Sequence, residues 1–192
     1  MNDLFPIFVR LKDRRALVVG GGHMATVRVR QLLAAGAAVT VIAPRTSDEI
    51  ERLAAKGSLQ LIKREFERTD VNLDFLVVIG ATNNASVQHE LVEEAERHRL
   101  LYSIVDSLEH SNFCTPAVVE RGDLKIAICT QGQSPVLAGR LRRELEEAIP
   151  ATASELTGLA GHLREKLKLK IPGKLKRQRE LLAEFIEKAA AE

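Results

Sequence analysis

The chain has 192 residues, of which 45% are hydrophobic and 28% are charged, and its formal net charge at pH 7 is +2. This composition excludes a disordered chain and predicts one substantial core with a smaller appendage. The small net charge and the aromatic content of 4% argue against nucleic acid as a partner, and no apolar run approaches the about 20 residues that span a bilayer, so no membrane partner is expected either.

The segment from residue 15 to 105 alternates short apolar runs with longer amphipathic ones. Apolar strands separated by helices are typical of a parallel sheet covered on both faces. We therefore expect an α/β fold, with a Rossmann-type domain of about five strands over residues 1–113. The preceding segment, LFPIFVRLKDR, is expected to be extended and to pack its apolar side chains on the sheet. These side chains are Leu4, Phe5, Ile7, Phe8 and Val9.

A glycine turn follows the first expected strand, in the sequence VVGGGHMA. Gly20, Gly22 and Ala25 fit the pattern G-x-G-x-x-A, in which the first glycine permits a tight turn and the second lets a pyrophosphate approach the backbone. The helix that follows offers N–H groups and a partial positive charge at its amino terminus. The turn therefore predicts a nucleotide site, against the alternative of a purely structural glycine turn.

The second expected strand, AVTVI, ends on Ala43, Pro44 and Arg45. An acidic residue usually stands there and binds the adenosine ribose, whereas a nearby arginine accommodates the additional phosphate of NADP. Arg45 therefore leaves NADP open, with a solvated loop arginine as the alternative. Without the acid, we expect backbone and loop groups at Pro44 and Arg45 to hold the adenosine, with modest affinity and weak discrimination.

The pattern changes after Asp106. TPAVVE and LKIAICT flank RGD and predict a hairpin with its turn at Gly122 and Asp123, followed by a helix capped by Ser134. We expect a small α+β module over 114–150 and a module of two helices over 151–192, with IPG between these helices. Because a hairpin and one helix cannot bury a core alone, we expect a homodimer whose interface comes mainly from 115–149.

The two cysteines, Cys114 and Cys129, lie in segments that are expected to be buried strands. They have no C-x-x-C spacing and no secretory signal precedes them, so we expect reduced core thiols and a cytoplasmic protein. The five histidines form no arrangement typical of a metal site, and no bound metal is expected.

The sequence resembles one family over most of its length. The matching stretches are VVGGGHMA…LLAAGAAVTVIAP, SIVD and FCTPAVVERGDLKIAICTQGQSPVLAGRLRRELE. They are similar to the precorrin-2 dehydrogenase and sirohydrochlorin ferrochelatase family, the amino-terminal portion of siroheme synthase. The resemblance implies an oxidoreductase that converts precorrin-2 to sirohydrochlorin with NAD. In some members it also implies a lyase activity that inserts ferrous iron, which would then be a substrate.

The resemblance also implies site residues. It assigns cofactor contacts to His23 and Met24 and to Pro44 and Arg45, and it assigns catalysis to Asp106. A carboxylate at the carboxyl end of a strand is well placed to accept a proton during oxidation; the alternative is an ordinary strand-end aspartate. The full set of expected cofactor-binding residues is Gly20, Gly22, His23, Met24, Ala25, Pro44, Arg45 and Thr82.

Substrate contacts are expected at Ser134, Arg140 and Arg142, because helix-start N–H groups and arginine forks suit a polycarboxylate. The chain departs from the family pattern at Ser103, where asparagine is usual, and at Gly139, where arginine is usual. A second class of function stays open: a non-enzymatic NAD(H)-sensing regulatory module. Such modules normally keep the acidic residue that is missing here.

Overall fold

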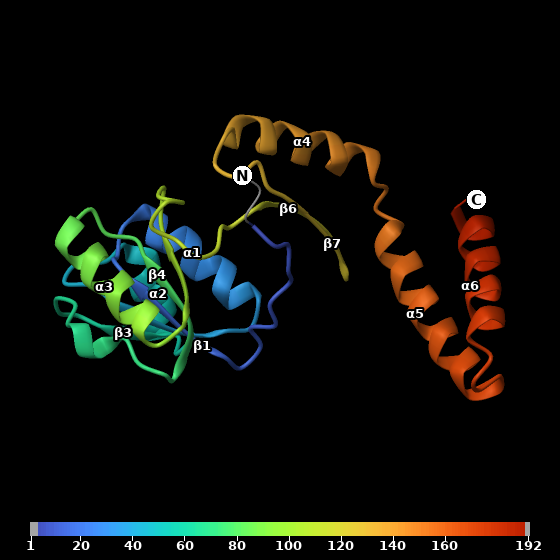
Figure 1. Cartoon of the computed structure of the whole chain (residues 1–192), viewed down its shortest axis with the longest axis horizontal. Helices are drawn as coiled ribbons and strands as arrows, with labels where there is room; N and C mark the ends of the chain where they lie inside the picture. Colours follow the sequence, from blue (N-terminus) through green and yellow to red (C-terminus); the bar gives the residue numbers. More distant parts are fainter. Residues whose placement is uncertain (1–3, 191–192) are drawn as a thin grey trace. The chain divides into compact units, whose positions relative to one another are not determined.

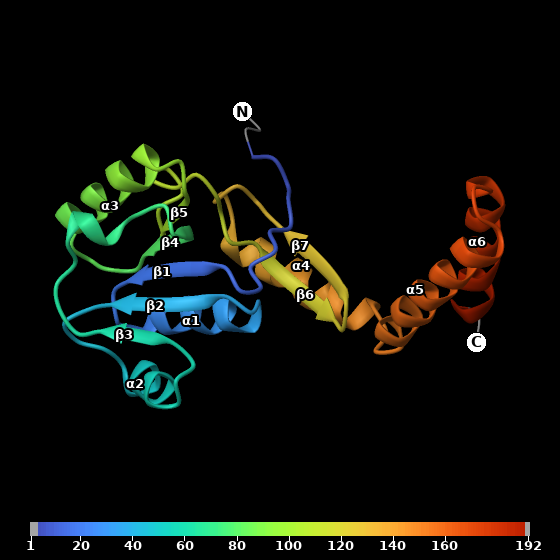
Figure 2. The same ribbon diagram turned by 90° about the horizontal axis from the view of Figure 1, so that it is seen from below.

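The computed structural model describes residues 4–190, and the chain divides into two compact units, 1–114 and 115–192. The first unit contains a five-stranded parallel sheet (Figure 1), and its strand order, β3-β2-β1-β4-β5, can be followed in Figure 2. This order is that of a Rossmann-type sheet, as predicted. The strands are β1 (Arg15–Val19), β2 (Ala38–Ile42), β3 (Gln60–Ile62), β4 (Phe75–Gly80) and β5 (Leu101–Ile104).

Helices cover both faces of this sheet. Ala16 and Val18 face a core shared with the first two helices, whereas Leu17 and Val19 face a core shared with the third. This alternation explains why β1 is apolar throughout: both of its faces are buried. The helices are α1 (His23–Ala34), α2 (Asp48–Ala55) and α3 (Ala85–Arg97), with a short 3₁₀ turn, η1 (Arg68–Asp70).

The lead-in before β1 does not pack as the sequence suggests. Phe5, Ile7 and Phe8 are 84%, 62% and 72% exposed, and Val9 is also exposed; only Leu4 of the predicted set is half-buried. The prediction of a packed lead-in is therefore wrong for these four residues. The reason is that helices cover both faces of the sheet, so neither face is left for these apolar side chains.

The second unit begins with an antiparallel hairpin of β6 (Ala117–Arg121) and β7 (Leu124–Ile128). The two-residue turn includes Gly122, whose φ of +57° suits glycine. Three helices follow: α4 (Pro135–Ala148), α5 (Ala153–Lys170) and α6 (Leu175–Ala190). Ser134 caps α4 by accepting a hydrogen bond from the Leu137 N–H at 3.1 Å. The predicted hairpin and helices are thus present, whereas the predicted functional division of this unit at residue 150 stays a prediction.

The cysteines are not in buried strands. Cys129 is exposed directly after β7, and Cys114 is half-buried in the loop that precedes β6. A two-stranded hairpin has few neighbours to bury its ends, and in this hairpin only Val119 is fully buried. The prediction of core thiols is therefore wrong. In the described residues, no helix is long and apolar enough to span a bilayer.

Candidate nucleotide-binding site

The loops after four parallel strands meet at one edge of the sheet. Backbone bonds continue the pairing one residue beyond the strands: Gly20 N–H donates to Ile42 O at 2.9 Å, and Ala81 N–H donates to Val19 O at 2.8 Å. Val105 N–H likewise donates to Gly80 O at 2.9 Å. These bonds bring the glycine turn, the loop after β2, the loop after β4 and the end of β5 to the carboxyl edge, where open parallel sheets bind ligands.

The three glycines of the turn have different surroundings. A Cβ on Gly20 would lie 2.2 Å from Ala81 O, and Gly20 has φ +122°. A Cβ on Gly21 would lie 2.1 Å from Arg45 O. Gly22 has nothing within 4 Å of its Cβ position. Gly20 and Gly21 thus permit the loops to pack, whereas Gly22 faces open space that an approaching ligand can use.

The amino terminus of α1 is built like an anion site. Gly22 is its N-cap, no side chain caps the helix, and its first turn contains no acidic residue. The N–H groups of His23, Met24 and Ala25 therefore have neither a carboxylate nor a capping oxygen competing for them. Ala25 is fully buried, which allows α1 to pack closely on the sheet, while His23 is exposed. This geometry fits a dinucleotide pyrophosphate.

The loop after β2 is tied to the glycine turn. Ser47 N–H donates to Gly21 O at 2.8 Å, and the hydroxyls of Ser47 and Thr26 share a hydrogen bond of 2.8 Å. Pro44 and Arg45 are exposed on this loop. The position of Pro44 relative to the turn is therefore set by hydrogen bonds on both sides of the loop.

A cavity opens at the same edge, between the loops after β1, β2, β3 and β4. It contains three of the predicted cofactor-binding residues, Gly20, Pro44 and Thr82. The other lining residues are Val19, Ile42, Ala43, Glu65, Phe66, Asn84 and Val87. Sequence reasoning missed Glu65 and Asn84. The available signal was the position of Glu65 shortly after an expected strand, because residues there reach the carboxyl edge.

Thr82 is held by its neighbours in the loop after β4. Its hydroxyl accepts from the Asn84 N–H at 3.2 Å, and its carbonyl accepts from Gln88 Nε2 at 2.5 Å. Asn84 in turn caps α3, its Oδ1 accepting from the Ser86 N–H at 3.0 Å. The loop that closes this side of the cavity is therefore preorganised.

Asp106 lies two residues beyond β5, exposed, with a φ of +62°. Asparagine and aspartate tolerate this left-handed conformation better than most residues. The following loop folds back on β5: Ile104 N–H donates to Ser111 Oγ at 2.9 Å, and Ser111 Oγ donates to Ser107 O at 2.6 Å. His110 shares a 2.8 Å hydrogen bond with Ser107 and is exposed.

Arg28 on α1 is a charged neighbour of Asp106 that sequence reasoning did not identify as a site residue. Burial lowers the pKa of Arg28, and the charge of Asp106 opposes that shift. The end of β5 lies close to α1, because Val105 packs on the same apolar cluster as Ala25 and Val29 of that helix. A half-buried cation therefore lies near the carboxylate at the end of β5.

The predicted substrate residues lie in the second unit. Ser134 caps α4, Arg140 pairs with Glu144 at 2.6 Å, and Arg142 pairs with Glu146 at 2.6 Å. The Arg140 pair is a solvent-exposed i,i+4 pair of the kind common on helices. The predicted contact of Ser134, Arg140 and Arg142 with substrate stays a prediction.

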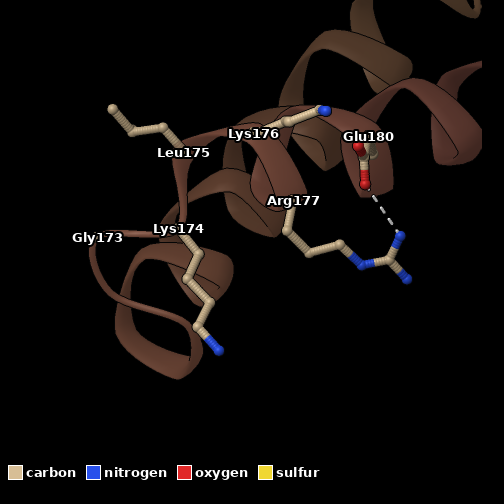
Figure 3. A pocket seen from close by; sticks show the side chains of 6 residues that line it. All are labelled: Gly173, Lys174, Leu175, Lys176, Arg177 and Glu180. Atoms are coloured by element: carbon tan, nitrogen blue, oxygen red, sulfur yellow. Dashed lines mark hydrogen bonds and ion pairs between the residues drawn. The ribbon is translucent and has the colours of Figure 1, made fainter.

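A second hollow lies at the turn between α5 and α6. Its lining residues are Gly173, Lys174, Leu175, Lys176, Arg177 and Glu180. Figure 3 shows the side chains of Lys174, Lys176 and Arg177 extending in different directions, and Arg177 pairs with Glu180 at 3.2 Å. Because these cations do not converge on one point, the hollow lacks the features of a ligand site. In the described residues, no three His, Cys, Asp or Glu side chains gather as a metal site would require.

The strand order, the glycine turn and the open start of α1 define a dinucleotide-binding protein of the Rossmann class. Consistently, the family model described as putative NAD(P)-binding matches residues 7–117, and the model described as sirohaem biosynthesis protein, central, matches residues 121–148. The solved structure of SirC, a precorrin-2 dehydrogenase, has a TM-score of 0.78 and 31% sequence identity, and the match covers 95% of this chain and 89% of that one.

Two curated relatives are siroheme synthases. That of Methylococcus capsulatus is 39% identical over 170 residues, 88% of this chain and 36% of the relative. Siroheme synthase 3 of Aeromonas hydrophila is 37% identical over 177 residues, 92% of this chain and 38% of the relative. The chain thus spans little more than a third of the length of these relatives. It belongs to the family of precorrin-2 dehydrogenases and siroheme synthases, as its sequence predicts, and this membership supports NAD as its cofactor.

Proposed function

We propose that the chain is an oxidoreductase that converts precorrin-2 to sirohydrochlorin with NAD in siroheme synthesis. The observation that carries the proposal is the presence, on one sheet edge, of an uncapped helix start at Gly22 and a carboxylate at Asp106. A nucleotide-sensing module needs only the first feature. The structural likeness to SirC, a precorrin-2 dehydrogenase, supports the choice of substrate.

The residues at the start of α1 fit the cofactor. Gly22 leaves room for the pyrophosphate, and the N–H groups of His23 and Met24 are oriented by the helix toward it. Pro44 and Thr82, which line the cavity, would contact the adenosine side, as would Arg45, which follows Pro44 on the loop. The small Ala25 keeps α1 close to the sheet. When bound, NAD supplies the acceptor for a hydride.

Asp106 is the proposed catalytic residue. Loss of a hydride leaves the tetrapyrrole electron-poor, and a neighbouring carboxylate stabilises that charge and accepts the accompanying proton. The exposed carboxylate at the end of β5 is accessible to such a substrate. Arg28 places a positive charge near this carboxylate.

The remaining contacts follow from the chemistry of the substrate. Precorrin-2 carries several carboxylates, which Arg140, Arg142 and the helix start at Ser134 would bind. We further propose a cytoplasmic homodimer. Its support is the exposure of Val136 (82%) and Leu137 (46%) on α4, apolar side chains that a second copy would cover. Ferrous iron is proposed as a substrate of a second, lyase reaction in which Asp106 takes the pyrrole protons.

An assay of the purified chain with precorrin-2 and NAD tests the function, with sirohydrochlorin formation followed by absorbance. Asp106→Asn should lower kcat at least about 100-fold, the usual contribution of a general base. Asp13→Asn is a matched control, because Asp13 is also an exposed aspartate with a left-handed φ, +60°. Undiminished oxidation by Asp106→Asn would remove this carboxylate from the chemistry, and NAD binding without turnover by the unmodified chain would favour the sensor.

A further inference from the structure

The loop after β3 is anchored on both sides of Glu65. Arg64 forms a bidentate pair with Asp70, with Nη1–Oδ2 at 2.8 Å and Nη2–Oδ1 at 2.5 Å. Asp70 Oδ2 also accepts from the Glu67 N–H at 2.8 Å. On the other side, Phe66 packs against the core that includes Ile42. Because both flanking residues are fixed, the backbone at Glu65 is fixed as well.

Glu65 is an exposed residue at the wall of the cavity in the nucleotide site. It lines this cavity together with Ala43 and Pro44, the residues that follow β2. Asp70 forms an ion pair with Arg64. By contrast, the Glu65 side chain makes no hydrogen bond or ion pair within the part of the chain that the structure describes. A negative charge without a protein partner therefore lies beside Pro44, on a preorganised loop.

The location coincides with a gap in the Rossmann pattern. In dinucleotide-binding sheets, an acid at the end of the second strand binds the adenosine ribose. Here that strand ends on Ala43 and Pro44. Since β3 pairs directly with β2, a residue shortly after β3 reaches the same corner of the sheet edge.

We propose that Glu65 replaces the missing acid: its carboxylate accepts hydrogen bonds from the adenosine ribose hydroxyls and excludes the 2′-phosphate of NADP. The inference rests on the proposed use of a nicotinamide dinucleotide, and it replaces the expectation of weak discrimination at this end of the cofactor. A carboxylate accepts hydrogen bonds from the ribose hydroxyls of NAD. It repels the 2′-phosphate of NADP, because both groups are negatively charged.

Arg45 is the competing residue, because an arginine near the end of β2 would favour NADP. Of the described residues, those that line the cavity include Glu65 and Pro44 but not Arg45. The charge that the ribose meets is therefore negative, and the chain should prefer NAD.

Isothermal titration of the purified chain with NAD and with NADP tests the proposal without requiring turnover. The unmodified chain should bind NAD at least about tenfold more tightly than NADP. Glu65→Gln should weaken NAD binding about tenfold or more, as expected for loss of a charged hydrogen bond. The same variant should bind NADP as well as or better than the unmodified chain.

Glu67→Gln is the matched control, since Glu67 lies two residues away on the same loop, is exposed and does not line the cavity. It should leave both affinities unchanged. An unaltered NAD-to-NADP ratio in Glu65→Gln would overturn the proposal, as would a preference for NADP that Arg45→Ala abolishes. Failure of the proposed oxidation would look different: NAD would bind in a Glu65-dependent manner while precorrin-2 stayed unoxidised. A chain that binds neither nucleotide would refute both.

Discussion

Replacing Gly20 by alanine should destabilise the first unit, whereas the same change at Gly22 should impair nucleotide binding alone. The added Cβ at Gly20 would lie 2.2 Å from Ala81 O, where ordinary contact begins at 3.4 Å, and the residue would keep a φ of +122°. Backbone strain costs about 1–3 kcal/mol and overpacking costs about as much again. The expected total, about 2–6 kcal/mol, is a large share of the about 5–15 kcal/mol that stabilises a typical domain.

Gly22 provides the contrast. It already has an extended φ of −81°, and a Cβ there meets nothing within 4 Å. Gly22→Ala should therefore change the free energy of unfolding by less than about 1 kcal/mol, the scale of an altered N-cap. Its methyl group would instead occupy space that we assign to the pyrophosphate.

Urea unfolding followed by tyrosine fluorescence measures the first effect. The chain has one tyrosine and no tryptophan, and Tyr102 is buried on β5, so the signal reports on the first unit. Gly20→Ala should lower the midpoint by about 1–3 M urea, and titration with NAD should show weakened binding in Gly22→Ala. A midpoint unchanged by Gly20→Ala, or NAD affinity unchanged by Gly22→Ala, would refute this assignment of the two glycines.

Two pH effects follow from other groups. Burial raises the pKa of Tyr102 to about 12, together with the hydrogen bond of 2.7 Å that the Tyr102 hydroxyl donates to the Glu96 carboxylate. The contribution of neutral Tyr102 to stability is therefore complete below pH 10 and is lost as the pH rises toward 12. Absorbance at about 295 nm should show that Tyr102 ionises later than a free tyrosine. Although burial acts to raise the pKa of Asp70, hydrogen bonds from Arg64 and from the Glu67 N–H outweigh it and lower that pKa below 3.8. The stability difference between the unmodified chain and Arg64→Gln should thus be complete well above pH 4 and should be lost as the pH falls through the lowered pKa of Asp70. A difference that persists in strong acid would contradict the assignment.

Local patterns were sufficient to predict the sheet and the glycine turn. The run Ala16–Val19 is apolar because both of its faces are buried, and Gly20 after it has a φ of +122°, a backbone conformation that favours glycine. The hairpin turn at Gly122 was predictable for the same reason, since its left-handed φ is a local requirement.

What the sequence could not show depends on neighbours distant in the chain. The exposed Phe5 and Phe8 are as apolar as core residues, and only the packing of helices on both faces of the sheet shows that no place is left for them. Glu65 looks like any loop glutamate until β3 is known to pair with β2. Arg28 looks like any helical arginine until the burial of its side chain and the position of Asp106 are known.

The strand order places the proposed nucleotide-selecting residue and the proposed proton acceptor at different positions along the sheet edge. Glu65 and Pro44 mark the corner formed by β2 and β3, whereas Asp106 follows β5 at the opposite side, three strand spacings from β2, or about 14 Å. The uncapped start of α1 follows β1, between these two positions. A dinucleotide whose pyrophosphate lies at that helix start can therefore place its adenosine toward β3 and its reactive ring toward β5. On this arrangement, nucleotide choice depends on Glu65 and proton acceptance on Asp106, and loss of the acid after β2 need not disturb the chemistry at the other end.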